Sequence, residues 1–317
     1  MAKEAIVKRY NREKYQISSK IPLWDFRGVK DYISILDNQL KRMDLEYFDV
    51  YLLHSLNEEK LPLVDKNGGW EFLKLIKQKG QARYIGFSFH SSALLLDRIL
   101  KAHPEIDVVQ LQINYVDWEN EQVQSRLCYE TARKHGKPVI IMEPIKGGYL
   151  TTMDADVTKI LKNYNSNASP ASWAIRYCAT LDGIITVLSG MSNLEQIDEN
   201  TNIAKNIKPL SHEERKVLED VVRALNQIPI IECTYCKYCI EHCPKRINIP
   251  MIISILNDYK KYNALPLITH NYMIDPSLGG KPNDCLQCKA CESSCSQHIE
   301  IINCMSQAPS LFKNRVL

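Results

Sequence analysis

The chain has 317 residues, of which 45% are hydrophobic and 24% charged, and 40 basic residues nearly balance 37 acidic ones. This length favours about two domains, and the scattered charges form no basic block of the kind that binds nucleic acid or a membrane surface. No apolar stretch approaches the roughly 18 residues that a membrane span needs, and the polar N-terminus lacks the features of a secretory signal, so we expect a cytoplasmic protein.

Short apolar, β-branched runs alternate with longer stretches of helical period from Lys14 to about Ala204. This alternation predicts repeated βα units and a parallel sheet. The expected strands lie at residues 15–19, 47–54, 82–88, 107–113, 138–142 and 183–188. The expected helices lie at residues 29–43, 69–79, 92–102, 120–135, 169–180 and 193–204. Gly80, Gly136 and Gly183 each separate a helix from a strand, as expected of residues that accept a left-handed helix C-cap.

The six βα units predict an α/β fold, an incomplete (β/α)8 TIM-type barrel over residues 1–207. Eight strands close such a barrel, so six leave unpaired edges that expose backbone donors and acceptors. Residues 2–10 resemble the tail of a helix that leads into the first strand. We therefore expect that two preceding βα units are missing from this sequence, either through truncation or as a variant of the fold.

Two further regions are expected after the barrel. Residues 208–230 are predicted to form a linker helix, and residues 231–317 a mainly helical ferredoxin-like domain. Ser211, with Glu214 three positions later, predicts a capping box at the start of the linker helix. Another amphipathic helix is expected at residues 249–262.

Two cysteine runs with the same spacing, C-x2-C-x2-C-x3-C, lie in the C-terminal region. The runs consist of Cys233, Cys236, Cys239 and Cys243, and of Cys285, Cys288, Cys291 and Cys295. This spacing predicts two [4Fe-4S] clusters, because three thiolates of a run hold one cluster while the fourth holds the other. By this logic Cys295 completes the first cluster and Cys243 the second. Zinc is the alternative, although tetrahedral zinc sites normally use separated pairs of cysteines.

The carboxyl ends of the strands carry the chemistry in barrels of this class, so residues at those ends are the first candidates for catalysis. Lys20 ends the first expected strand, and His54 ends the second. Each also has a plain structural interpretation, namely a solvated lysine and a histidine hydrogen-bonded near the core.

In this order, the segments ISSK, YLLHSL, YIGFSFH and VVQLQINY resemble motifs of the aldo-keto reductase family, specifically of its branch with a C-terminal ferredoxin domain. The resemblance implies catalytic roles for Lys20 and His54. It also implies that Ser88 and Gln110 contact the nicotinamide of NADPH or NADH. The segment EPIKGGYL, which contains Gly147, resembles the loop after the seventh barrel strand.

The segment LSGMSNLEQIDEN resembles the phosphate-binding segment that follows the eighth strand in this family. The resemblance implies cofactor contacts from Gly190, Ser192, Gln196 and Asn200. Independently of it, Ser192 and Glu195 predict a capping box that opens a helix, whose free N–H groups suit a phosphate. An ordinary capped helix explains Ser192 equally well.

The sequence departs from the family pattern at three points. Phe89 follows Ser88 where the family has asparagine. Gly190 and Gln196 stand where basic residues typically grip the 2'-phosphate, so the choice between NADPH and NADH stays open. No residue matches the family's catalytic tyrosine and its supporting aspartate, which lie on the first two barrel units.

We therefore expect an iron-sulfur oxidoreductase that transfers hydride between NAD(P)H and a small carbonyl or alcohol substrate, inactive as given if the missing units are required. The alternative is a 4Fe-4S electron-transfer or redox-sensing protein on a barrel scaffold, which exchanges electrons with a redox partner protein. A truncated fragment of a longer gene product is the third interpretation.

Overall fold

The computed structural model describes residues 2–23, 28–265, 269, 272–273 and 275–313. Contacts divide the chain into two compact units, Met1–Pro144 with Ala174–Leu210, and Ile145–Trp173 with Ser211–Leu317. The sequence had placed residues 145–173 in the barrel region. They group with the second unit because α6 (Ala155–Tyr164) packs against α9 (His212–Gln227). The expected boundaries near residues 207 and 230 stay predictions.

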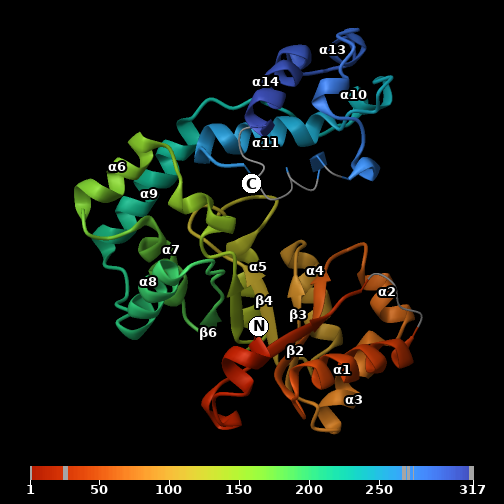
Figure 1. The fold of residues 1–317 in the computed structure, drawn as a ribbon, viewed down its shortest axis with the longest axis vertical. Helices are drawn as coiled ribbons and strands as arrows, with labels where there is room; N and C mark the ends of the chain where they lie inside the picture. Colours follow the sequence, from red (N-terminus) through yellow and green to blue (C-terminus); the bar gives the residue numbers. More distant parts are fainter. Residues whose placement is uncertain (1, 24–27, 266–268, 270–271, 274, 314–317) are drawn as a thin grey trace. The chain divides into compact units, whose positions relative to one another are not determined.

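The first unit is built on one parallel sheet of six strands, in the order β1 to β6 (Figure 1). The strands are β1 (Ser18–Ile21), β2 (Phe48–Leu56), β3 (Ala82–Phe89), β4 (Val108–Gln112), β5 (Val139–Met142) and β6 (Ile184–Val187). Each strand pairs with its neighbours in chain order. Within the described residues, β1 and β6 each keep one edge unpaired, which confirms the expected incomplete barrel of six βα units.

Helices lie between and after the strands of the first unit close to the predicted positions, although the helix predicted at residues 120–135 begins only at Ser125. They are α1 (Val29–Met43), α3 (Gly69–Gln78), α4 (Ala93–Ala102), α5 (Ser125–Lys134), α7 (Pro170–Ala179), which crosses the boundary between the units, and α8 (Leu194–Lys205). Two short helices, η1 (Lys3–Val7) and η2 (Arg12–Lys14), precede β1. A helix that was not predicted, α2 (Leu61–Lys66), begins with a proline in its first turn, where the missing N–H costs nothing.

The central strands are buried on both faces, as a parallel sheet requires. Leu52, Phe87 and Val109 are fully buried. Gly86 allows β3 to approach β4, because a Cβ at this position would lie 2.0 Å from the carbonyl oxygen of Val108. All three glycines predicted to end helices, at positions 80, 136 and 183, adopt positive φ, so that prediction is confirmed.

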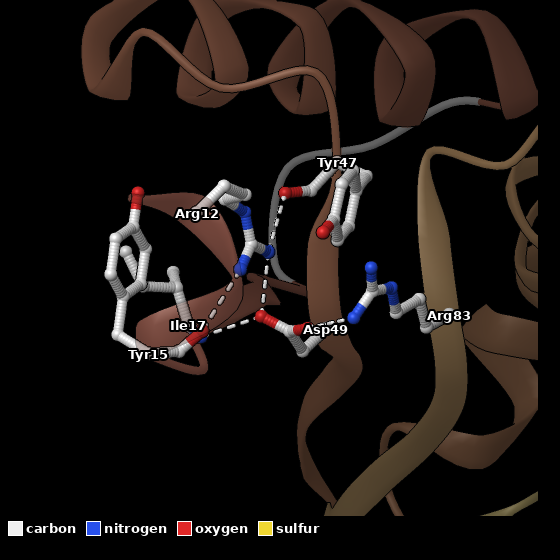
Figure 2. Close-up of polar contacts among 6 residues, drawn as sticks. All are labelled: Arg12, Tyr15, Ile17, Tyr47, Asp49 and Arg83. Atoms are coloured by element: carbon white, nitrogen blue, oxygen red, sulfur yellow. Dashed lines mark hydrogen bonds and ion pairs between the residues drawn. The ribbon is translucent and has the colours of Figure 1, made fainter. Parts of the chain in front are cut away.

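A buried ion-pair network fastens the segment before β1 to the neighbouring strands (Figure 2). Asp49 accepts hydrogen bonds from Arg12 Nη2 at 2.6 Å, from Arg83 Nη1 at 3.2 Å and from the Ile17 N–H at 2.8 Å. Both guanidinium groups also lie over the ring of Tyr47, 4.0 and 4.3 Å from its centroid. Because the Asp49 side chain is only 4% exposed, water screens these interactions little. The network therefore holds β1, which lies at one edge of the sheet formed by the described residues.

The second unit is mainly helical. Besides α6 and α9 it contains η3 (Lys146–Thr151), α10 (Tyr238–Glu241), α11 (Ile249–Tyr262), η4 (Pro276–Leu278), η5 (Pro282–Asp284), α13 (Ala290–Ser293) and α14 (Ile301–Lys313). The predicted capping box of α9 is confirmed, since Ser211 and Glu214 each accept the other's backbone N–H. The helix α11 has the predicted bounds, and it packs on α14 around buried Ile252 and Met305.

None of the helices in the described part of the chain combines the length and the hydropathy needed to cross a membrane.

Candidate functional site

The two predicted catalytic residues lie on neighbouring strands of the first unit. Lys20 is in β1, where it pairs in register with Leu52, and His54 follows two residues later in β2. Desolvation lowers the pKa of Lys20 below its ordinary value. Desolvation and the positive charges of Lys20 and Lys60 lower the pKa of His54. Lys20 and His54 therefore lie close enough for the charge of one to act on the other.

A bulge in β2 positions His54. Ser55 has a left-handed φ of 58°, and the pairing of β2 with β3 shifts between Leu53 and Leu56. The Ser55 N–H donates a hydrogen bond to Ser88 Oγ at 2.7 Å, and Ser88 is buried. Bulges beside functional sites re-aim the adjacent side chains. In this structure Ser88, predicted to contact the nicotinamide, also fastens the backbone next to His54.

Gln110, the second predicted nicotinamide contact, is the register partner of Ser88 on β4. Register partners on parallel strands point to the same face of a sheet, and both side chains are buried. The Nε2 of Gln110 donates to Met142 Sδ at 3.0 Å. Two buried polar groups on one face fit a polar ligand such as a carboxamide.

Sequence reasoning missed His90 and Lys60. His90 directly follows β3, and its N–H donates to the Leu56 carbonyl at 3.0 Å. Desolvation and the positive charges of Lys60, His54 and Lys20 lower the pKa of His90. The strand-end criterion that selected Lys20 and His54 would also have selected this histidine in FSFH. Lys60 carries no such signal, because it lies in a turn before the unpredicted helix α2.

The start of α8 differs from the prediction. The N-cap is Asn193, whose Oδ1 accepts the Gln196 N–H at 2.9 Å, while Gln196 Oε1 accepts the Ser192 N–H at 2.7 Å. The capping box expected from Ser192 and Glu195 is therefore wrong by one residue. Both serine and asparagine are good N-caps, and the equivalent spacing from Asn193 to Gln196 is the one that forms.

The other predicted phosphate contacts lie in the same region. Asn200 Nδ2 donates to Ser189 Oγ at 3.0 Å, and this contact ties α8 to the loop after β6. Gly190 is exposed in that loop, and a Cβ there would meet no atom within 4 Å. Gly147 belongs to the second unit, where its φ of 64° and that of Gly148 bend η3.

The two cysteine loops of the second unit have the same backbone conformation. Positive φ occurs at Tyr235 and Lys237 in the first loop, and at Gln287 and Lys289 in the second. Each loop then enters a short helix, α10 or α13. Left-handed residues of this kind turn successive N–H groups into a concavity that suits anionic groups, including iron-sulfur clusters.

A pocket in the second unit collects cysteines from both runs. Its lining includes Cys243 from the first run and Cys285, Cys288 and Cys291 from the second, together with apolar residues such as Met305. This is the combination that the spacing predicted for the second cluster. Four thiols in apolar surroundings fit a [4Fe-4S] cluster.

The thiols of the first run also lie close together. Burial and the neighbouring Cys233 and Cys236 raise the pKa of Cys239 to about 11.

Among the described residues, no group of three or more His, Cys, Asp or Glu side chains is arranged to hold a single metal ion.

Comparison with known proteins gives a match over most of the chain. Residues 1–223 match the model of the aldo/keto reductase family, and residues 232–300 match that of a 4Fe-4S dicluster domain. A probable aldo-keto reductase of Glycine max is 29% identical over 153 residues, which cover 45% of this chain and 41% of that protein. Aldo-keto reductase family 4 member C11 of Arabidopsis thaliana is 27% identical over 208 residues, covering 61% and 62%.

Solved structures give the same fold for the barrel region. An aldo-keto reductase of Klebsiella pneumoniae, determined in complex with NADPH, superposes with a TM-score of 0.54 at 18% identity. The superposition covers 70% of this chain and 74% of that one. The chain spans about two fifths of the length of one of the two curated relatives above and about three fifths of the other.

Proposed function

The chain belongs to the aldo/keto reductase family and continues into a 4Fe-4S dicluster domain, and from this premise we propose that it transfers hydride between NAD(P)H and a carbonyl or alcohol substrate. The observation that carries the proposal is the position of Lys20 and His54 on neighbouring strands, each with a lowered pKa. The Klebsiella relative solved with NADPH supports the choice of cofactor.

We assign Lys20 and His54 to the carbonyl oxygen of the substrate. A bound nicotinamide supplies the hydride, and Ser88 and Gln110 supply buried polar groups for its carboxamide. Because the pKa of His54 is lowered, its ring is mainly neutral near pH 7 and can donate an N–H hydrogen bond. The ammonium group of Lys20 stabilises the negative charge that develops on the oxygen.

Oxidation of NADPH with simple aldehydes, measured on the chain extended by two N-terminal βα units, tests this assignment. Replacing one group that stabilises a developing oxyanion lowers kcat by about 10²- to 10³-fold, so we expect this loss for Lys20→Met and for His54→Gln. Lys79→Met, on the exposed end of α3, is the matched control and should keep the rate. Equal rates in all three variants would contradict the assignment.

The same assay should compare the present chain with the chain extended by two N-terminal βα units, because six strands form the described sheet. The family's tyrosine and aspartate lie on those two units, and a phenol is an effective proton donor to a carbonyl oxygen. We expect activity only in the extended form. Full activity of the present chain would show that its own residues deliver the proton.

We also propose that the second unit holds two [4Fe-4S] clusters, with Cys243 and Cys295 exchanged between the runs. The pocket lined by Cys243 and three cysteines of the second run supports this exchange. Iron analysis and EPR spectroscopy of the reconstituted chain test it. Cys243→Ala, Cys288→Ala and the double variant should each lose the same half of the iron. A double variant that loses all the iron would refute the exchange.

A second candidate function is electron transfer or redox sensing with the barrel as a scaffold. The repeated conformation of the two cysteine loops favours it, because this set of ligands is present in full. Hydride carries two electrons whereas each cluster accepts one, so direct coupling would call for a flavin between them. Under this proposal the clusters exchange electrons with a separate redox protein in the cytoplasm, where thiol ligands stay reduced.

A reductive titration followed by EPR separates the two functions. Clusters that change oxidation state at potentials accessible to cellular donors support electron transfer. If the clusters stay in one oxidation state throughout the titration, their role is structural. That result would contradict the second candidate function.

A further inference from the structure

We propose that Lys245, in the segment that follows the first cysteine run, raises the reduction potential of the second iron-sulfur cluster above that of the first. This inference rests on the two clusters proposed above and on the exchange of Cys243 and Cys295 between the runs. One electron supplied by an external reductant would then reside on the second cluster in preference to the first. Lys245 would thereby set the direction in which an electron moves within the domain.

The two cysteine runs continue into segments with the same backbone conformation. Arg246 and His298, each three residues after the last cysteine of its run, have left-handed φ values of 47° and 51°. Their N–H groups donate to the carbonyl of that cysteine at 2.9 and 3.1 Å. The short helices α10 and α13, one from each run, lie side by side (Figure 1). The two halves of the site are therefore structural repeats, in which Lys245 corresponds to Gln297.

The cysteine ligands of the two runs are also matched in type and in burial. Cys239 and Cys291, the third cysteine of each run, are both 8% exposed. Cys236 and Cys288 are both exposed, and the other ligands of both runs are half-buried. The potential of such a cluster depends on its ligands, the net charge around it, the hydrogen bonds to its sulfurs and its exposure to solvent. Because ligands, backbone donors and exposure are alike, the charge around each cluster is the difference to compare.

The charged residues differ only after the runs. Each run, taken from the residue before its first cysteine, contains one lysine and two carboxylates. They are Glu232, Lys237 and Glu241 in the first run, and Asp284, Lys289 and Glu292 in the second. The first run is then followed by PKR, and the second by SQH. The contrast between the two halves therefore lies in Lys245 and Arg246.

Packing holds Lys245 at the pocket proposed for the second cluster. It lines that pocket together with Cys243 and three cysteines of the second run, and among the described residues it is the one charged side chain in the lining. Gly280, shortly before Cys285, fixes its backbone, because a Cβ at Gly280 would lie 2.3 Å from the Lys245 carbonyl oxygen. The Gly280 N–H also donates to the Arg246 carbonyl at 3.1 Å. A positive charge held here stabilises the negative charge that a cluster gains on reduction.

A reductive titration of the reconstituted full chain, followed by EPR at about pH 8 where histidine is ordinarily neutral, tests the inference. We expect two one-electron steps. Lys245→Gln should lower the upper step by about a tenfold change in its equilibrium constant, which is about 59 mV for a one-electron couple. Gln297→Lys places the same charge at the equivalent position and should raise the lower step by a similar amount. Lys245→Arg keeps the charge and should leave both steps unchanged.

Further variants identify the cluster behind each step. Cys288→Ala should abolish the upper step and keep the lower one, whereas Cys236→Ala should do the reverse. The matched control Lys216→Gln, at an exposed position of α9, should leave both steps unchanged.

Salt gives a readout that a purely structural role of Lys245 would not move. Its charge is exposed, so the separation between the two steps should shrink as the salt concentration rises to about 1 M. Three results would overturn the inference: a single unsplit step in the unchanged chain, an effect of Lys245→Gln on the lower step, or a separation that salt does not change.

Iron analysis separates this inference from the proposed function. Two clusters require about eight iron atoms per chain. Half of that content in the unchanged chain would refute the two-cluster proposal itself. Full content with overlapping steps would refute only the order of the potentials, and NADPH oxidation enters neither measurement.

Discussion

Replacing Asp49 with alanine is expected to destabilise the first unit by about 3–5 kcal/mol, the cost of breaking a buried ion pair from one side. The Asp49 side chain is 4% exposed and that of Arg12 is 20% exposed. The substitution leaves the Arg12 guanidinium without its anionic partner and the Ile17 N–H without its acceptor. Arg83 adds little to this cost, because its side chain is 54% exposed and water replaces the lost contact.

Hydrogen exchange of the β1 and β2 amides, measured in low denaturant, reports the free energy of opening for this part of the sheet. The matched control is Asp107→Ala. Asp107 also accepts a strand N–H, that of Ile85 at 2.9 Å, and pairs with Lys77 at 2.6 Å. Its side chain is 25% exposed and that of Lys77 is 40% exposed, so we expect a loss of only about 1–2 kcal/mol.

A double variant separates loss of the pair from loss of the aspartate alone. Adding Arg12→Met to Asp49→Ala removes the charge that the single change leaves uncompensated. The double variant should therefore be more stable than the sum of the two single losses predicts, with a coupling of about 0.5–3 kcal/mol. If Asp49→Ala costs no more than Asp107→Ala, burial does not strengthen this network and the reasoning is refuted.

Three further predictions concern the first unit. In the chain extended by two N-terminal βα units, Ser88→Ala should lower kcat up to about 100-fold, because it releases the bulge that orients His54. Ser88→Thr keeps the hydroxyl group and should keep most of the rate. Equal rates in the two variants would contradict this positioning role. Because the pKa of His54 and of His90 is lowered on folding, the unfolded chain binds protons more readily, so denaturant titrations should show stability falling as the pH drops through about 6.5. Replacing both histidines with asparagine should flatten that dependence. In the same titrations, Gly86→Ala should lower the free energy of unfolding by about 1–3 kcal/mol or more, because the added Cβ overlaps β4. Gly190→Ala should leave the free energy of unfolding almost unchanged, because a Cβ there meets no atom within 4 Å.

The secondary structure followed closely from local pattern. The bounds of α1 and α11 agree with the prediction to the residue, and the capping box of α9 forms between the predicted Ser211 and Glu214. Hydrophobic period, caps and glycines act over one or two helical turns, so a sequence window contains what decides them. Such a window cannot choose between Ser192 and Asn193, because both residue types are good N-caps. This explains why the predicted start of α8 was wrong by one residue.

The site was only partly predictable. A residue at a strand end is a candidate by position, which is how Lys20 and His54 were found. The role of Ser88 in fastening a bulge depends on its register against β2, and register depends on how the strands pair. The pKa of His90 depends on the charges of Lys20, His54 and Lys60, which lie 30 or more residues away in the sequence.

The sequence by itself determined the alternation of strands and helices, the family and the cysteine spacing, because each of these can be recognised within short segments of the chain. Tertiary structure alone decided three further features. It grouped residues 145–173 with the second unit, placed Cys243 in a pocket with the second cysteine run, and brought His90 within reach of the positive charges of Lys20, Lys60 and His54. These features depend on packing between distant segments, and the desolvation and repulsion that shift the pKa values arise only once that packing has formed.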